Sequence, residues 1–327
     1  MTLWKAIGLP LINIVFIMVI AVIWAALLTW VERRMLGFWQ ERYGPNRVGP
    51  SGVFQVVADF IKLLMKEDFT PRYGDRFVFV IAPASLVIAV LMPFGILPIA
   101  KHIGVSSDLN IGILFFLAMS SLTVYSVVLG GWASNNKYSL LGSLRGASQM
   151  LSYEVFMGLA LMGVVLITGT FNLRKIVEAQ STGMLYVLPQ FFGFVIFFIA
   201  GLAETRRLPY DLPEGEQELV AGYHTEYSSM KFALYFLGEY LGVILISALI
   251  TTLYFGGWRG PFLPGWLWFM IKTIFFMLTF ILLRAALPRP RYDQLTAFGW
   301  KVMLPLALLN FLVTGAVVLI LMPQGGS

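Results

Sequence analysis

Long apolar runs separated by short charged segments dominate this chain. Eight runs are long enough to cross a bilayer core of about 30 Å, which needs about 20 helical residues at 1.5 Å each. They lie at approximately residues 9–31, 77–98, 110–131, 152–170, 185–203, 236–256, 266–286 and 302–322. Such continuous runs favour helices over barrel strands, because a helix satisfies its own backbone hydrogen bonds in lipid. The pattern predicts an all-α integral membrane protein with eight transmembrane helices in one transmembrane domain, residues 1–327.

The segment between the first two runs, residues 32–76, is too long to be a simple connector. Its apolar side chains recur at the spacing of one helix face, and they are Val57, Ile61, Leu64 and Met65. This spacing predicts an amphipathic helix that lies in the membrane interface. Two roles remain open for the predicted helix: a surface anchor for anionic lipid, or one side of a ligand entrance.

Composition agrees with a membrane environment and restricts the redox chemistry. The 327 residues are 58% hydrophobic and 12% charged, against about 25% charged residues in soluble domains. Cysteine is absent and the two histidines are His102 and His224. Thiolate ligation of iron and disulfide bonds are therefore excluded, and a bis-histidine heme site could use only this single pair. Any redox metal is expected to belong to another protein.

The basic residues are distributed unequally between the two sides of the predicted bundle. The odd-numbered loops carry 17 of the 23 Lys and Arg residues, whereas the opposite side carries 5 and Lys272 lies within the seventh run. The positive-inside rule assigns the odd loops to the cytoplasm and both termini to the periplasmic side. The predicted cytoplasmic loops are residues 32–76, 132–151, 204–235 and 287–301. The net charge of +6 thus reflects membrane topology, and nucleic acid is not an expected partner.

Two carboxylates interrupt the apolar runs. Glu154, in "LSYEVFMG", and Glu239, in "FLGEYLGV", are each predicted to lie about one turn into the membrane from the cytoplasmic face. An ionisable side chain there costs several kcal/mol and is by default a candidate for function. Snorkelling to the interface is the alternative, but glutamate is too short to reach far.

One loop, "ETRRLPYDLPEGEQELVAGYHTEY" at residues 204–227, concentrates acidic side chains. Its six carboxylates belong to Glu204, Asp211, Glu214, Glu216, Glu218 and Glu226. A solvated acidic loop is the usual interpretation of such a run. However, interleaved leucine, valine and tyrosine side chains are atypical of a freely solvated segment.

The electrostatics of this loop depend on its burial. Two carboxylates about 6 Å apart repel by roughly 0.7 kcal/mol in water but by roughly 3 kcal/mol at an effective dielectric of 20, which is about two pKa units. A partly buried cluster would therefore hold protons near neutral pH and titrate as a coupled set. Together with Glu154 and Glu239, the loop predicts an acidic path that enters the membrane from the cytoplasm.

Several other polar residues have weaker interpretations. Glu32 and Arg33 form a charged pair in sequence at the predicted mouth of this path, although a positive-inside anchor also explains the arginine. His224 with Glu226 could bind a metal, but a satisfied polar contact is the more common role of one such pair. Lys272 is typical of a lysine that reaches the outer interface. Signatures of soluble nucleotide-binding or hydrolytic enzymes are absent from the sequence.

Four further blocks complete a recognisable pattern with the acidic loop. They read "ERRMLGFWQERYGPNRVGP" (32–50), "ADFIKLLMKED" (58–68), "SNNKYSLLGSLRGASQMLSYE" (134–154) and "LPRPRYDQL" (287–295). In this order, and over residues of about 20 to 320, the chain resembles the NuoH family of bacterial NADH:quinone oxidoreductase, respiratory complex I, and its counterpart in the mitochondrial enzyme. Arg206 stands where Asn is frequent in that family, and Tyr210 where Phe is.

The resemblance implies a membrane subunit that couples quinone reduction to proton translocation. Such a subunit receives the quinone headgroup near an iron–sulfur cluster of a peripheral subunit, while the tail lies in a tunnel beside the first and sixth helices and the interfacial helix. By resemblance, Glu32 and Arg33 line the tunnel, with Arg289 and Arg291 near it. The implied chain of acids comprises Glu154, Glu204, Asp211, Glu214, Glu216, Glu218, Glu226 and Glu239.

The resemblance also implies the surroundings of the chain. Its substrate would be ubiquinone or menaquinone, and the chain itself would bind no iron–sulfur cluster, flavin or metal. Peripheral iron–sulfur subunits, neighbouring membrane subunits and lipids would be its partners in the bacterial inner membrane, and the chain would be inactive alone. Two alternatives remain open: an independent ion or proton transporter with the same acids, and a related subunit of a membrane-bound hydrogenase.

Overall fold

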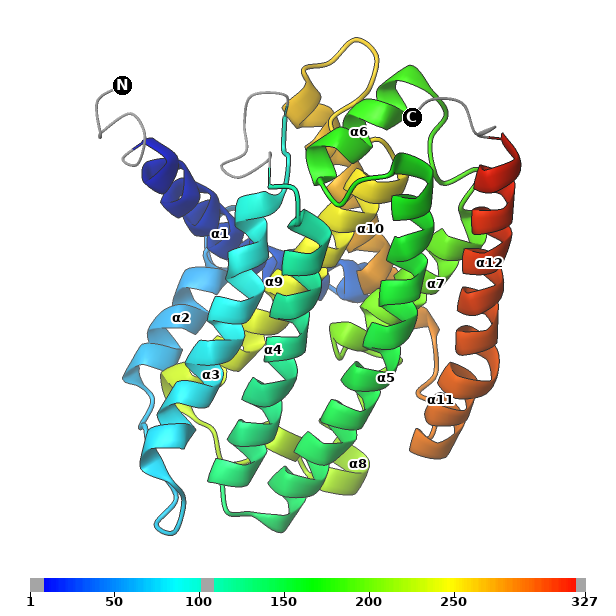
Figure 1. The fold of residues 1–327 in the computed structure, drawn as a ribbon. Coiled ribbons are helices and arrows are strands. Elements are labelled where there is room, and N and C mark those ends of the chain that lie inside the picture. Colours follow the sequence, from blue (N-terminus) through cyan, green and yellow to red (C-terminus); the bar gives the residue numbers. More distant parts are fainter. Residues whose placement is uncertain (1–8, 101–108, 322–327) are drawn as a thin grey trace.

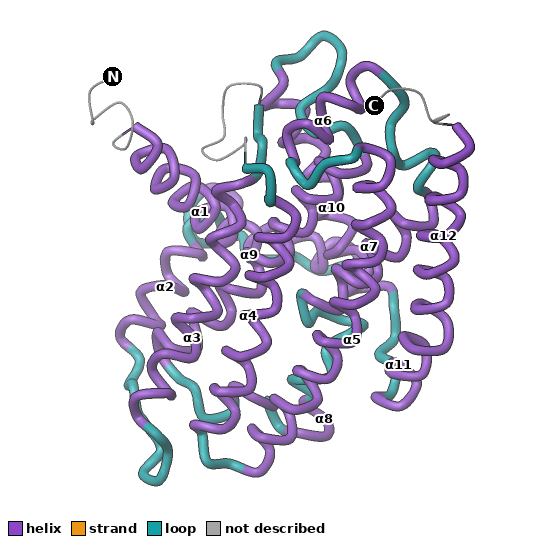
Figure 2. Tube along the Cα trace, viewed as in Figure 1, coloured by secondary structure: helices purple, strands orange, loops and turns teal. Residues whose placement is uncertain are grey.

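Helices joined by loops make up the described part of the chain (Figure 2). The computed structural model describes residues 9–100 and 109–321, and it contains no strand in these ranges. The helices are α1 (Leu9–Trp39), α2 (Gln55–Met65), α3 (Arg76–Leu91), α4 (Gly112–Ala133), α5 (Lys137–Thr168), α6 (Leu173–Thr182), α7 (Phe191–Glu204), α8 (Glu216–Leu219), α9 (Ser229–Tyr254), α10 (Gly265–Ala286), α11 (Tyr292–Phe298) and α12 (Leu304–Leu321). The predicted all-α class is confirmed.

Seven helices in the described residues are long and apolar enough to cross a membrane, so the chain is a multi-pass membrane protein. They are α1, α3 with the 3-10 turn that follows it, α4, α5, α9, α10, and the unit in which a π-helical turn joins α11 to α12. The remaining predicted run, residues 185–203, corresponds to α7. This helix has 14 residues and is therefore only about 21 Å long at 1.5 Å per residue.

The start of α7 is set by a polar contact inside the bundle. Pro189 precedes it and has no backbone N–H, so residues just before α7 form a turn instead of a helix. The side chain of Gln190 then bridges to α12: it accepts a hydrogen bond from Asn310 (2.9 Å) and donates one to Thr314 (2.6 Å). These contacts hold the N-terminal end of α7 against α12.

Helix α5 begins much earlier than predicted. The Asn136 side chain accepts a hydrogen bond from the backbone N–H of Tyr138 (3.0 Å) and caps the helix, which then runs for 32 residues. Residues 137–151 are therefore helical, although they were predicted to be loop. Glu154 consequently lies about 25 Å along the helix from Lys137 at 1.5 Å per residue, and its depth in a membrane stays a prediction.

Helix α9 lies at the centre of the bundle. It contacts α1, α3, α7 and α10, and its residues from Gly238 to Tyr254 are buried almost without interruption. An apolar sequence on every face suits such a position, because no side of the helix meets water. Glu239 is the carboxylate that this central helix brings into the interior.

The predicted amphipathic helix is present as α2. None of its residues is buried, and its predicted apolar face is open, with Val57 53% and Met65 83% exposed. The backbone carbonyl of Leu63 accepts a hydrogen bond from the Ser229 hydroxyl (2.9 Å), which fixes the end of α2 against the start of α9. The membrane-interface position of α2 stays a prediction.

The long helices alternate in direction, so that one end of the bundle collects the acidic loop and its neighbours (Figure 1). The α2–α3 and α4–α5 connections, α8 and α11 lie towards the lower end in this view. The first turn of α1, helix α6 and the last turn of α12 lie towards the upper end. The loops that the charge count assigned to one side thus share one end of the bundle.

Candidate functional site

The acidic segment 204–227 folds against the bundle. Its apolar side chains Leu212, Leu219, Tyr223 and Tyr227 are buried. The segment also approaches α5 closely, because a Cβ atom added to Gly142 would stand 2.7 Å from both Gly222 Cα and the Pro213 carbonyl oxygen. The solvated-loop interpretation is therefore wrong for the inner part of this segment, and the burial that shifts carboxyl pKa values is met there.

A buried ion cluster joins α1, the acidic segment and α10. Glu32 is 4% exposed, and its two carboxylate oxygens accept hydrogen bonds from Arg207 at 3.1 and 3.0 Å. Arg284 of α10 also binds Glu32. On its other side, Arg207 Nε lies 3.8 Å from a carboxylate oxygen of Glu239. Two buried carboxylates thus share two guanidinium groups, which compensates most of their charge.

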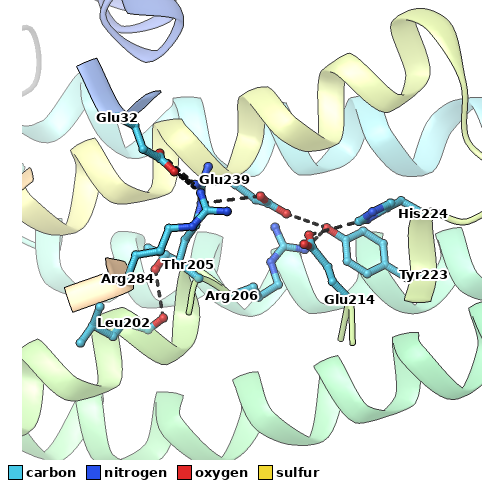
Figure 3. A network of polar contacts seen from close by, with 10 residues as sticks. Glu32, Leu202, Thr205, Arg206, Glu214, Tyr223, His224, Glu239 and Arg284 are labelled. Carbon is cyan, nitrogen blue, oxygen red and sulfur yellow. Dashed lines mark hydrogen bonds and ion pairs between the residues drawn. The ribbon is translucent and has the colours of Figure 1, made fainter. Parts of the chain in front are cut away.

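Glu239 connects this cluster to an aromatic hydroxyl (Figure 3). Tyr223 donates a hydrogen bond of 2.9 Å to Glu239 Oε1 and accepts one of 3.3 Å from Arg206 Nη1. Arg206 is 4% exposed and has a φ of 53°, in the left-handed region that Asn adopts more readily than Arg. Burial disfavours its charge, but Tyr223, Glu239 and Glu214 raise the pKa of Arg206 above its ordinary value, so it remains a cation.

Glu214 is the point at which the acidic loop meets the interior. Its carboxyl group hydrogen-bonds with Asp211 and with Glu239, and it lies 3.7 Å from His224 Nδ1. Burial, with the charges of Glu239 and Asp211, raises the pKa of Glu214 well above its ordinary value. Burial and the charge of Glu239 raise the pKa of Asp211 to about 6, against the opposing effect of Arg289. Both pKa shifts have the direction that the coupled-titration hypothesis requires.

We expect Asp211 to lose its proton close to pH 6 in the folded protein. Infrared difference spectra of the protein should show a protonated-carboxyl band that disappears with this midpoint and is missing from the Asp211→Asn variant. Because the pKa is raised from its ordinary value to about 6, the folded state binds the extra proton. Stability from this group is therefore present at low pH and is lost as pH rises through 6. A band that persists unchanged from about pH 5 to about pH 8 would contradict the assignment.

Two further predicted acids face hydroxyl groups of α4. Glu204 Oε1 accepts hydrogen bonds from Ser120 (2.9 Å) and Thr123 (3.2 Å). Glu154 Oε1 accepts one from Ser121. Neighbouring serines of α4 thus hold one acid from α5 and one from the end of α7, and hydroxyl groups can both donate and accept during proton movement.

The other two acids of the loop whose side chains are described, Glu218 and Glu226, have partners outside this inner group. Glu218 is 52% exposed in its side chain and pairs with Arg145, which lowers its pKa. Glu226 accepts a hydrogen bond of 2.7 Å from Asn136. Glu216 begins α8, and its side chain lies outside the described part of the structure. Of the five carboxylates whose side chains the structure describes, Glu204, Asp211 and Glu214 are therefore the ones brought towards Glu239.

The four residues assigned to the tunnel by resemblance separate into two groups. Glu32 belongs to the ion cluster, and the Arg289 guanidinium lies against Gly215, beside Asp211. Arg33 is 44% exposed and pairs with Asp59 of α2 at 2.5 Å, which means that it does not extend the interior cluster. Arg291 is 74% exposed and pairs with Asp293. The sequence pair Glu32–Arg33 is thus divided between two environments.

Several residues that complete this site were not predicted from the sequence. Arg207 and Arg284 entered only the charge count that set the topology, and Tyr223 entered only as a sign of burial. Two adjacent arginines beside an acidic run could have indicated the cations of the ion cluster, because buried carboxylates need cationic partners. The hydroxyl residues of "MSSLTV" in α4 could have indicated hydrogen-bond partners for the buried acids, since polar groups within an apolar span must find partners.

The two residues with weak interpretations have local roles. Lys272 donates hydrogen bonds to the carbonyls of Phe255 (2.7 Å), Gly257 (3.1 Å) and Arg259 (2.6 Å), and so stabilises the chain that follows α9. His224 lies beside Glu214, in the inner network. Within residues 9–100 and 109–321, no group of three His, Cys, Asp or Glu side chains is arranged to hold a metal ion.

Cavities follow the seam between α1, α9 and α10. Beside Glu32 and Arg284 the free space is only about 10 Å³, which is no more than the room that one water needs. Farther along the same seam, an apolar pocket of about 260 Å³ is lined by residues that include Ile17, Trp24 and Met277. The seam therefore has a charged part near Glu32 and an apolar part farther along α1.

Two comparisons with known proteins each match most of the chain. A family model described as NADH dehydrogenase matches residues 12–315. The NADH-quinone oxidoreductase H chain (NuoH) of Methylococcus capsulatus is 61% identical over 312 residues, which cover 95% of this chain and 98% of that protein. The matched region includes α1, the acidic segment, α9 and α10, and therefore every element of the buried network.

Proposed function

The chain belongs to the NuoH family of NADH-quinone oxidoreductase subunits, and from this premise we propose that it forms the membrane side of a quinone chamber and couples quinone reduction to proton translocation. It acts only within the assembled complex, in the bacterial inner membrane. Peripheral iron–sulfur subunits supply electrons, and neighbouring membrane subunits receive the coupling signal.

The buried carboxylate network is the observation that carries this proposal. Glu32, Glu239, Glu214 and Asp211 are linked through Arg207 and through direct hydrogen bonds. Reduction of a quinone to a quinol consumes two electrons and two protons, so it changes the charge beside such a network. At an effective dielectric of 20, the interaction energy between a carboxylate and a unit charge about 6 Å away is roughly 3 kcal/mol. This energy shifts the pKa of the carboxyl group by about two units. That is enough to move protons between coupled acids.

The quinone is proposed to occupy space shared with a partner subunit. The free volume beside Glu32 and Arg284 is too small for a quinone ring, so the headgroup requires a wall that the peripheral subunit supplies against the acidic segment. The apolar pocket between α1, α9 and α10 offers room for part of an isoprenoid tail. Ubiquinone and menaquinone both satisfy this chemistry.

The proposed topology keeps eight membrane crossings within a single transmembrane domain. Helix α7 is short, but the hydrogen bonds of Gln190 hold the turn that precedes it beside α12. With α7 counted, both termini lie on the periplasmic side and residues 32–76, 132–151, 204–235 and 287–301 face the cytoplasm. In that arrangement residues 137–151 are a helical extension of α5 beyond the membrane, and α2 lies in the cytoplasmic interface.

The relay proposal predicts different results for two glutamates of the acidic loop. Glu214→Gln, at the junction with Glu239 and Asp211, should lower proton pumping by the assembled complex about tenfold, equivalent to about 1.4 kcal/mol of barrier. Glu218→Gln should leave pumping within about twofold, because this exposed side chain only pairs with Arg145. Proteoliposomes that contain the intact complex, NADH and quinone provide the measurement.

The pair also serves as its own control, since both variants replace one carboxyl group of the same loop by an amide. Equal pumping by the Glu214→Gln complex and wild type, with normal assembly, would remove Glu214 from the relay. A loss of pumping in Glu218→Gln as large as in Glu214→Gln would show that the loop acts through its surface charge instead of its buried acids.

A further inference from the structure

The loop that joins α9 to α10 exposes an aromatic side chain on a strained backbone. In Figure 1 this loop projects at the upper end of the bundle, beside α6. Phe262 at its tip is fully exposed, and its neighbour Leu263 is 42% exposed. The backbone N–H of Leu263 donates to the carbonyl of Pro261 (2.9 Å), so Phe262 is the centre of a three-residue turn, with a φ of 68°. This form of turn is rare and strained, above all for a bulky residue.

The rest of the loop is fastened to the bundle. Lys272 of α10 donates hydrogen bonds to three of its backbone carbonyls. The indole N–H of Trp268 donates to the carbonyl of Pro261 (2.7 Å), and Arg259 donates to the carbonyl of Gln180 in α6. Contacts on both sides of the tip thus maintain the strained turn. A strained conformation that its surroundings enforce is a reason to look for a function.

The side chains of the loop indicate what covers the tip. Trp258, Trp266 and Trp268 lie within eleven residues of one another, and Arg259 is exposed. No carboxylate occurs in the sequence between residues 240 and 292. Tryptophan is enriched where membrane meets water, because its ring is apolar and its N–H is polar. Arginine binds phosphate oxygens well. An aromatic and cationic surface without acids therefore matches the headgroup region of a phospholipid leaflet.

The length of α10 places the tip at the corresponding depth. This helix has 22 residues, which makes it about 33 Å long at 1.5 Å per residue. The hydrocarbon core is about 30 Å thick, and the headgroup regions bring the whole membrane to about 40–45 Å. When α10 crosses the core, Gly265 at its start therefore lies close to the core boundary. Phe262 precedes Gly265 by three residues, which places its side chain in the headgroup region.

We propose that the tip of the α9–α10 loop, Phe262 and Leu263, is a membrane anchor that inserts between phospholipid headgroups, with Arg259 directed to their phosphates. In the proposed topology this is the periplasmic leaflet. The anchor fixes the depth of α10, and the same helix carries Arg284 of the ion cluster towards its opposite end. The inference concerns a surface outside the acidic segment and does not depend on the relay.

Photocrosslinking in the intact complex identifies what touches the tip. The photoreactive residue p-benzoylphenylalanine replaces Phe262, and the complex is reconstituted with phosphatidylethanolamine and phosphatidylglycerol before irradiation. The same replacement at Phe275, which is 62% exposed in the middle of α10, is the control for contact with lipid tails. We expect phospholipid adducts at both positions in mass spectra of the chain.

Every other result at position 262 overturns the anchor. An adduct to another subunit would show that the tip docks a protein. The absence of any adduct at 262, with lipid adducts at 275, would show that the tip is surrounded by water. If the altered complex fails to assemble, cryo-EM of the wild-type complex in a lipid nanodisc decides. Phe262 outside the lipid density would then refute the proposal, and Phe262 within it would support it.

Two substitutions test the anchor by the sign of their effect. Aspartate adopts a positive φ more readily than phenylalanine, so in water Phe262→Asp should preserve or increase the amount of assembled complex. In the headgroup region Phe262→Asp should lower this amount several-fold, because the inserted ring is lost and a charge replaces it. Phe262→Trp keeps an interfacial ring and should assemble like the wild type. Native gels of membranes provide the measurement, and an undiminished Phe262→Asp complex would exclude the anchor.

Discussion

Replacement of Arg207 by methionine is expected to prevent stable assembly of the subunit. The substitution removes the guanidinium between Glu32 and Glu239, which are 4% and 6% exposed, and leaves Arg284 as the remaining cation of the cluster. Breaking a buried ion pair costs about 3–5 kcal/mol, which is a large part of the roughly 5–15 kcal/mol that stabilises a typical domain. The amount of intact complex on native gels and its thermal unfolding midpoint measure the effect.

Arg291→Met provides the matched control for this substitution. Arg291 is 74% exposed and pairs only with the exposed Asp293, so its removal should change stability by less than about 0.5 kcal/mol. Arg207→Lys should give an intermediate result, because lysine keeps the charge but cannot bind Glu32 with the same planar group. Assembly and thermal midpoint of Arg207→Met equal to those of the wild type would refute the assigned role of the cluster.

Gly222→Ala is expected to displace the acidic segment from the bundle and to abolish quinone-linked turnover. Gly222 has a φ of +59°, and an added Cβ would lie 1.7 Å from the Pro213 carbonyl oxygen, a backbone atom that cannot rotate away. The left-handed conformation adds about 1–2 kcal/mol for a residue with a side chain. Because Tyr223 is the next residue, a shift at Gly222 also withdraws the hydroxyl that binds Glu239.

Gly169→Ala is the control that separates the two effects of Gly222→Ala, the steric clash of the added Cβ and the free-energy cost of a left-handed backbone. Gly169 has a φ of +66°, but an added Cβ there would have no neighbour within 4 Å. This variant should therefore lose about 1–2 kcal/mol of stability through the backbone alone and retain turnover. NADH:quinone turnover and limited proteolysis of residues 204–227 in both complexes make the comparison. Normal turnover in Gly222→Ala would show that the segment tolerates a different packing.

The sequence predicted those site residues whose chemical type alone is unusual in their local sequence. Glu239 and Glu154 are conspicuous because an ionisable group in an apolar run is costly wherever it points. The partners of such groups could not be predicted in this way, because Arg207 and Arg284 lie 175 and 252 residues from Glu32 in the chain. No local pattern indicates which distant arginine will reach which carboxylate. Arg33, the sequence neighbour of Glu32, pairs instead with Asp59.

The helix boundaries also depend partly on local sequence, which can be read in advance, and partly on contacts with distant segments, which cannot. The apolar run at 152–170 was recognised, but the extension of α5 back to Lys137 depends on the Asn136 cap and on packing of Gly142 and Gly146 against Pro213. These glycines and the serines around them are poor indicators of a helix in isolation. The tertiary contact with the acidic segment stabilises a helix that local propensity does not favour.

The sequence by itself determined that this chain is an all-helical membrane protein, because crossing a bilayer requires a length of apolar residues that can be counted along one dimension. Its motifs also identified the family. Only the tertiary structure decided which acids are buried together: Glu214 with Glu239 and Asp211, Glu204 beside the α4 hydroxyls, and Glu218 outside. The physical reason is that a carboxyl pKa depends on burial and on charges within a few ångströms, and both are set by chain segments that meet only after folding.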